Sequence, residues 1–198
     1  MIETPDAARL IDSVSALVEA ARRAGADAAD AVAVRSRSAG VSVRMGKVES
    51  TGSSESDDIS LRVFVGRKVA SVSATADSDA AALAERAIAM AKASPEDPYQ
   101  GLVDEGLLAR GEIDLDIFDP TQVGADQLRE AALEAEEAAL AVQGVTNSGG
   151  SGAGAGLGGL VLATSNGFLG QYAVSRFSRS VSAIAGEGSA KCWCEEKS

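Results

Sequence analysis

The sequence contains no histidine, and this absence excludes more chemistry than any other feature of the chain. Histidine is the usual general base near neutral pH, the commonest metal ligand in proteins, and the base beside the nucleophile in most serine and cysteine hydrolases. The chain therefore lacks the usual machinery of a hydrolase. We predict that it carries no catalytic residue, no cofactor-binding residue and no metal ligand of its own.

Cysteine is nearly as scarce, because Cys192 and Cys194 are the two cysteines of the chain. A disulfide between two cysteines this close in sequence cannot link distant parts of a core. Neither a disulfide framework nor an oxidising compartment is therefore indicated. Two thiolates also fall short of the four ligands of a structural zinc site. The Cys-Trp-Cys run is therefore predicted to lie in an unstructured tail.

Long apolar runs are missing as well. No stretch approaches the ~20 apolar residues of a membrane span, and Glu3, Asp6 and Asp12 stand where a signal peptide would need a basic start and an apolar run. Hydrophobic residues make up 45% and charged residues 24% of the 198 residues, which is ordinary globular usage. We expect a soluble, cytoplasmic protein without a membrane partner.

Basic residues are missing from one segment in particular. The net charge is −11, and residues 94–143 carry 13 acidic but only 2 basic side chains. Because nucleic-acid affinity depends on a basic surface, we expect no direct nucleic-acid partner. The carboxylates of this segment at Asp114, Asp116 and Asp119 lack the glycine and closing glutamate of a calcium loop. We interpret them as solvated side chains of an extended segment whose apolar residues are tucked in.

The periodicity of residues 1–93 predicts an α+β unit. Apolar residues recur at helical spacing from Ala7 to Ala21, with Gly25 as a natural C-cap, and again from Ala81 to Ala91. Between these helices the period is two, which predicts an antiparallel meander of about four strands that ends with Lys68–Thr75. A helix, a meander and a helix make a compact unit with both helices on one face.

The remainder begins with a proline-broken acidic linker from about residue 94, followed by a helix. Alanine and glutamate favour this helix from about Ala125 to Val142. Its predicted inner stripe consists of Leu128, Ala132, Ala135, Ala139 and Val142. We therefore divide the chain into an α+β N-terminal domain over 1–120 and an incomplete domain over 121–198.

Ten of the 21 glycines lie between Gly144 and Gly170. The run Gly152–Gly159 lacks the lysine and the following helix of a phosphate-binding loop. It is interpreted as a flexible connector or as a strand that lets another backbone approach closely. Strand patterns then follow on both sides of an Asn-Gly turn up to Ala185, which indicates the start of a second, β-rich sheet.

Five short strings carry a resemblance to a known family, and they are Ala24–Asp27, Val65–Ser73, Ser94–Leu102, Phe118–Pro120 and Thr164–Phe168. In this order they resemble the TldD/PmbA family, and within it the PmbA (TldE) branch. The resemblance extends to about Gly188 and corresponds to the N-terminal portion of members about twice as long. Residues 189–198 depart from the family pattern, which puts protease competence of a chain that ends there in doubt.

The resemblance implies a metal-free, non-catalytic subunit of a cytoplasmic heterodimeric metalloprotease. Its TldD-like partner would hold the zinc ion, unfolded peptides would be the substrate, and this chain would carry no cofactor. One alternative is a standalone peptide-binding module that acts by edge-strand addition in residues 157–185, where exposed strands would also favour self-association. Another is an acidic modulator of DNA gyrase, although the carboxylates lie in a proline-broken segment and on an ordinary helix face.

Overall fold

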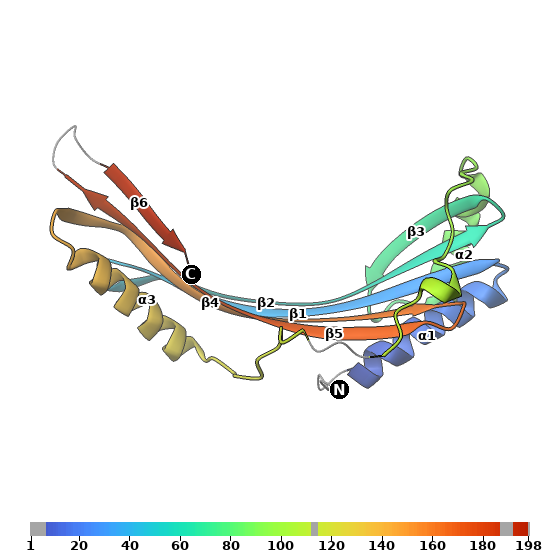
Figure 1. The fold of residues 1–198 in the computed structure, drawn as a ribbon, viewed down its shortest axis with the longest axis horizontal. Helices are drawn as coiled ribbons and strands as arrows, with labels where there is room; N and C mark the ends of the chain where they lie inside the picture. The colour runs from blue at the N-terminus through green and yellow to red at the C-terminus, as the bar shows by residue number, and fades with distance from the viewer. Residues whose placement is uncertain (1–6, 112–114, 187–191, 198) are drawn as a thin grey trace. The chain divides into compact units, whose positions relative to one another are not determined.

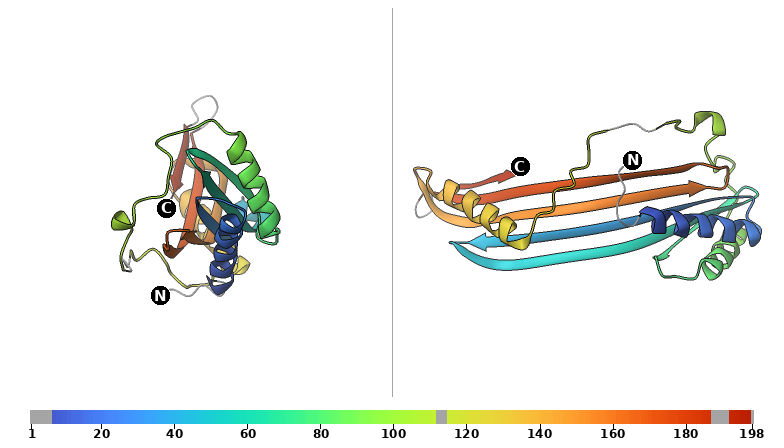
Figure 2. Two further views of the ribbon diagram at one scale, coloured as in Figure 1. Left: turned by 90° about the vertical axis from the view of Figure 1, so that its right-hand side faces the viewer. Right: turned by 90° about the horizontal axis from the view of Figure 1, so that it is seen from below.

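The computed structural model describes residues 7–111, 115–186 and 192–197. They form an α+β fold with a six-stranded sheet in the order β3-β2-β1-β4-β5-β6 (Figure 1), and Figure 2 gives two further views. The predicted fold class is thereby confirmed. The elements are α1 (Ala7–Arg23), β1 (Ala28–Arg44), β2 (Lys47–Val65), β3 (Lys68–Thr75), α2 (Ala80–Ala93), the 3-10 helix η1 (Glu105–Leu107), α3 (Ala125–Leu140), β4 (Val145–Thr164), β5 (Leu169–Ala185) and β6 (Cys192–Lys197).

The described residues divide into two compact units, each made of separate stretches of the chain. Unit 1 takes its residues from 1–35, 56–117 and 158–173. Unit 2 takes its residues from 36–55, 118–157 and 174–198. Whether residues 1–120 fold as a domain of their own stays a prediction, which truncation of the chain tests.

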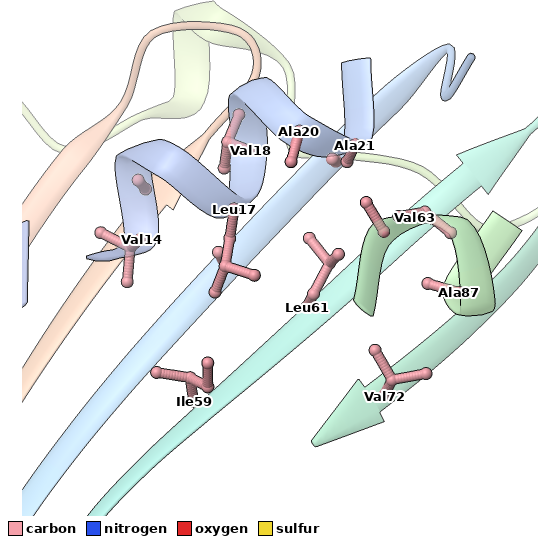
Figure 3. Packing of buried hydrophobic residues seen from close by; sticks show 14 of the residues in the cluster. Val14, Leu17, Val18, Ala20, Ala21, Ile59, Leu61, Val63, Val72 and Ala87 are labelled. Carbon is pink, nitrogen blue, oxygen red and sulfur yellow. The ribbon is translucent and has the colours of Figure 1, made fainter. Parts of the chain in front are cut away.

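The core of unit 1 lies between its two helices and one face of the strands (Figure 3). Leu17 of α1, Leu61 of β2 and Val72 of β3 belong to one buried cluster. On α2 the inner positions are mainly alanines, such as Ala84 and Ala87, and both are fully buried. Small side chains let α2 approach α1 and β3 closely, and both helices contribute to this one cluster, as predicted.

The N-terminal part of the sheet consists of three long strands rather than the expected four. The polar stretch from Thr51 to Ser56 does not interrupt the sheet, because β2 runs without a break from Lys47 to Val65. Side chains 47–55 are exposed, so the stretch shows no alternation of apolar and polar residues that would identify it as a strand. The following hairpin turns at Gly66, which has a φ of 59°, and pairs β2 with β3 as predicted.

In unit 2, α3 packs on β1 and β4. Leu128 and Ala132 of the helix form a buried cluster with Val41, Val43 and Ala153. Of the five predicted inner residues, Leu128 and Ala132 are therefore confirmed as buried, while Ala135 and Ala139 are half-buried. The fifth, Val142, is 59% exposed because the helix ends at Leu140.

The glycine-rich segment is a strand, not a flexible connector. Within β4 a Cβ added at Gly154 would lie 3.4 Å from the carbonyl oxygen of Ala39 and 3.2 Å from Ser178 Oγ, so neighbours on both sides approach it closely. The expectation of a second sheet is wrong, because β4 pairs with β1 and all six strands belong to one sheet. Local sequence patterns predict strands but not their partners, which is why this pairing was missed.

The end of the described chain also corrects the sequence analysis. Cys192 and Cys194 belong to β6, which pairs antiparallel with β5 from Ala185↔Cys192 to Ser180↔Lys197. The predicted unstructured tail is therefore wrong for residues 192–197. The edge of β5 offers free main-chain donors and acceptors, and pairing with them satisfies the backbone of the tail whatever its side chains are.

Candidate functional site

The most fully built polar site of the described chain surrounds a buried carboxylate on α3. Glu136 is 2% exposed and receives backbone hydrogen bonds of 2.8 Å from Met45 N and from Gly46 N, one to each oxygen. Ser148 Oγ of β4 donates a further short hydrogen bond to Oε1. Met45 and Gly46 both have positive φ, 50° and 73°, so their successive N–H groups point to the same anion.

This environment determines the charge of Glu136. Burial raises the pKa of its carboxyl group, but the hydrogen bonds from Ser148, Gly46 and Met45, together with the charge of Arg44, outweigh burial and lower the pKa below its ordinary value. The group is therefore a permanent anion at neutral pH. Because its oxygens accept hydrogen bonds from Met45 N, Gly46 N and Ser148 Oγ, the carboxylate anchors α3 to the β1–β2 turn.

Glu136 was absent from the sequence analysis, although a signal for it exists. Leu128 and Ala132 are buried at a spacing of four, and the next position on the same face is Glu136. A carboxylate at an inner helix position must find partners, since an unpaired buried charge is costly. The turn that supplies those partners lies far away in sequence.

Unit 1 contains two further groups of buried or half-buried charges. Arg62 Nε and Nη2 donate hydrogen bonds of 2.9 and 2.5 Å to Asp30 Oδ2, and the Asp30 residue is 7% exposed. Asp57 accepts a hydrogen bond of 3.0 Å from Arg9 Nη2, and Arg35 Nε lies 3.2 Å from its other oxygen. Each carboxylate is paired with at least one arginine, so both groups tie elements of unit 1 together.

The acidic cluster of the linker does not form a cation site in the described residues. Asp114 lies outside them, while Asp116 and Asp119 are exposed. The side-chain and backbone hydrogen bonds of Thr121 lower the pKa of Asp119. In the described ranges no group of three or more cysteines or acidic residues converges on a metal position. The apolar neighbours Leu115 and Ile117 are 63% and 38% exposed, so the expectation that they are tucked in is wrong.

The sheet offers one polar hollow in unit 2 and one mainly apolar hollow in unit 1. The first has a volume of about 260 Å³ and is lined by residues that include Ser42, Gly150, Gly152, Ser180 and Ser182. The second has a volume of about 410 Å³ and is lined by residues that include Val32, Val34, Ile59, Ser73 and Thr75. Serine hydroxyls occur in both, and neither lining contains a lysine. One carboxylate lines each hollow, Glu49 in the first and Asp58 in the second.

Open sheet edges are the remaining candidate sites. The structure shortens the edge that the sequence predicted over residues 157–185. Residues 157–164 offer no edge, because β4 is paired on one side with β1 and on the other with β5. This part of the predicted edge-strand site is wrong. In β5, the described neighbour β6 covers only Ser180 to Ala185, which leaves residues 169–179 open on the outer side. Leu169, Tyr172 and Phe177 along this edge are 52%, 53% and 43% exposed.

Comparison with known proteins places this fold. A family model described as PmbA/TldA metallopeptidase domain 1 matches residues 29–91, and one described as the PmbA/TldA metallopeptidase central domain matches residues 118–194. The chain belongs to the PmbA/TldD family. A Metalloprotease PmbA homolog of Haemophilus influenzae is 34% identical over 181 residues, which are 89% of this chain and 40% of that protein. Metalloprotease PmbA of Escherichia coli O157:H7 is 32% identical over 182 residues, again 40% of its length.

Solved structures agree with the PmbA/TldD fold. A candidate modulator of DNA gyrase from Bacteroides thetaiotaomicron has a TM-score of 0.85 at 20% identity, covering all of this chain and 45% of that one. TldE from Thermococcus kodakarensis has a TM-score of 0.78 at 14% identity, covering 93% of this chain and 42% of that one. The chain thus spans less than half the length of these relatives. In the described ranges no helix is long and apolar enough to cross a membrane.

Proposed function

We propose that this chain forms the N-terminal portion of a metal-free, non-catalytic PmbA/TldE-type subunit of a peptide-degrading metalloprotease. The match of two successive family domains to residues 29–91 and 118–194 carries the proposal. Relatives about one third identical over nine tenths of the chain are named metalloproteases. In this proposal the zinc ion belongs to a TldD-like partner, and this chain contributes binding surface to the complex.

The open edge of β5 is the surface best suited to bind a peptide. The N–H and C=O groups of alternate residues from 169 to 179 face the outer side and can hydrogen-bond to an extended chain of any sequence. Tyr172 and Phe177 add exposed aromatic surface beside that backbone. A main-chain contact of this kind is compatible with degradation of varied unfolded peptides, because it requires no particular side chain of the substrate.

Co-expression with a TldD-like protein tests the proposal. We expect a stable complex that hydrolyses an unfolded protein such as casein, and we expect chelation of zinc to abolish the hydrolysis. This chain purified alone should bind no stoichiometric zinc and cleave nothing. Failure to form a complex, or zinc-dependent hydrolysis by this chain alone, would contradict the proposal.

A standalone peptide-binding module remains the second candidate, since the β5 edge would serve it equally well. The variant Gln171→Pro distinguishes peptide binding at this edge from binding elsewhere. Phe168 O accepts a hydrogen bond from Thr164 N of β4, so even-numbered residues of β5 face β4 and odd-numbered ones such as Gln171 face outward. Proline at this exposed position removes one outward backbone donor and leaves the pairing with β4 intact. If the module acts alone, fluorescence anisotropy should show binding of an extended peptide without any partner. If the complex is required, binding should appear only after the TldD-like protein is added.

A further inference from the structure

The Asn166-Gly167 turn between β4 and β5 brings together the groups of a reaction that the proposed function does not use. Asn166 is half-buried, and Gly167 is exposed with a φ of 93°. Glycine has no Cβ, so its backbone nitrogen approaches the side-chain amide carbon of a preceding asparagine without obstruction. A Cβ added at Gly167 would meet nothing within 4 Å, so the turn is open on this side. The turn therefore leaves room for the backbone to react with the Asn166 amide.

Thr164 activates that amide. Its Oγ1 donates a hydrogen bond of 2.5 Å to Asn166 Oδ1 and accepts one of 3.0 Å from Phe168 N. Hydrogen bonds in such a chain polarise one another, and this chain ends on the amide carbonyl oxygen. A donor at this oxygen stabilises the negative charge that develops there when a nucleophile adds to the carbon. The turn thus supplies both the nucleophile and the group that assists it.

The same amide holds the linker to the β4–β5 hairpin within unit 1. Asn166 Nδ2 donates a hydrogen bond of 3.1 Å to the carbonyl oxygen of Val103. The side chains of Val103 and Leu107 are 56% and 77% exposed, so apolar burial contributes little to holding this stretch. Asp104 and Glu105 follow Val103 directly, so negative charge already lies next to the contact. The contact therefore depends on the uncharged, donating amide of Asn166.

We propose that Asn166 is a site of spontaneous deamidation, and that its conversion to an acid releases the linker at Val103. Gly167 N bonds to Asn166 Cγ while the Cγ–Nδ2 bond breaks, and the proton lost from Gly167 N leaves with the ammonia. Water then opens the resulting succinimide ring at either carbonyl and gives aspartate or isoaspartate. One water is consumed and one ammonia is released, without oxidation or reduction. Gly167 N donates a hydrogen bond of 3.1 Å to Thr164 O, so this bond opens before the reaction and keeps it slow.

The product reverses the contact with Val103. A carboxylate has no N–H to donate, so one of its oxygens replaces Nδ2 opposite the carbonyl oxygen. The new negative charge is also repelled by Asp104 and Glu105. The linker is released as the chain ages, and an extended, accessible backbone is the preferred substrate of proteases. The turn thus acts as a timer for the lifetime of the chain.

Peptide mass spectrometry of the 198-residue chain, incubated at mildly alkaline pH, tests the chemistry. We expect the mass gain of an amide-to-acid change at Asn166, faster at higher pH because Gly167 N must lose its proton. Asn147 is the only other asparagine and serves as the internal control. It precedes Ser148, which is 2% exposed and whose N–H is held by Asn147 Oδ1 at 2.8 Å, so Asn147 should stay intact. Absence of conversion at Asn166, or equal conversion at Asn147, overturns the proposal.

Substitutions of Thr164 test the assistance by its hydroxyl group. Thr164→Val should slow the conversion of Asn166 about tenfold, because the donor at Oδ1 is lost. Thr164→Ser keeps a hydroxyl group and should retain the natural rate. A rate in Thr164→Val that equals or exceeds the natural rate would overturn the activating role of Thr164.

Asn166→Asp tests the release of the linker separately. Hydrogen exchange of the backbone amides from 102 to 108 should become about fivefold faster, because the hydrogen bond to Val103 is lost. Gln171→Glu makes the same amide-to-carboxylate change at an exposed position of β5 and should leave this exchange unchanged. Circular dichroism verifies that both variants fold, and aged natural chain should show the faster exchange without any substitution. Unchanged exchange in Asn166→Asp and in aged chain, or equal acceleration by Gln171→Glu, contradicts the release.

Discussion

Glu136 and Gly46 are joined by a hydrogen bond of 2.8 Å between a helix carboxylate and the N–H of a β-turn. The two residues are 90 positions apart in sequence, and Ser148 of β4 completes the site. One anion thus connects α3, the β1–β2 turn and β4 within unit 2. The site explains how a short amphipathic helix with few large apolar residues is fixed on the sheet.

We expect Glu136→Ala to lower the free energy of unfolding by about 2–4 kcal/mol, because it leaves the N–H groups of Met45 and Gly46 without their acceptor. Urea unfolding followed by circular dichroism measures the loss. Glu137→Ala is the matched control, since Glu137 is exposed and its loss should cost less than about 0.5 kcal/mol. Equal effects of the two substitutions would contradict the role assigned to Glu136.

The pH dependence of stability follows from the same carboxylate. Its pKa in the folded chain is lowered from the ordinary value of 4.5. A lowered folded pKa means that the stabilisation is complete above the unfolded value and is lost as the pH falls through the folded value. The difference in unfolding free energy between the natural chain and Glu136→Gln should therefore be constant well above the ordinary pKa and shrink as the pH falls through the lowered folded pKa. A difference that grows on acidification would have the wrong sign.

The β1–β2 turn carries strain that substitution can relieve. Met45 has a φ of 50° without being glycine, and it is 57% exposed. A two-residue turn with positive φ at both central positions is the type for which Asn-Gly is preferred. Met45→Asn should raise the free energy of unfolding by about 0.5–1 kcal/mol, because asparagine tolerates this backbone region better. Met45→Val should lower the free energy of unfolding. Thermal unfolding of both variants tests whether Met45→Asn is more stable, and Met45→Val less stable, than the natural chain.

The helices of the chain could be predicted from the sequence because their signals are local. The spacing of Leu10, Val14 and Leu17 and the glycine at position 25 are sufficient to place α1 and its end. Partners in the sheet could not be predicted in the same way. The glycines of β4 and the serines near Thr51 in β2 have no apolar alternation, and their strands are formed by pairing with residues distant in sequence.

The polar site around Glu136 could not be predicted from the sequence for the same reason. Glu136 meets its donors only after β1, β2 and α3 are in place, because the turn that donates to it lies 90 residues away in sequence. By contrast, the resemblance of short strings to a family was informative because their order along the chain is itself a long-range signal. Family membership could thus be inferred where the site could not.

The core of unit 1 depends on a strand that the predicted domain 1–120 does not contain. Val161 and Ala163 of β4 are buried in the same cluster as Leu17, and Ser165 N donates a hydrogen bond of 2.8 Å to the carbonyl of Ala29. We expect Val161→Ala to cost about 1–3 kcal/mol in the complete chain. A chain truncated after residue 120 should unfold at lower urea than the 198-residue chain. Equal midpoints would support an independent domain over 1–120.

Limited digestion with chymotrypsin should cut the linker first and the glycine-rich strand late. The linker around Tyr99 and Leu107 has no regular structure apart from η1, and these two side chains are 95% and 77% exposed. A protease needs an extended, accessible backbone, which this segment offers and which a strand paired on both sides withholds. Mass spectrometry of early fragments should therefore show cleavage after Tyr99 or Leu107 before any product ends at Leu157 or Leu160. Early products from residues 157–160 would mean that β4 opens more easily than its two pairings allow.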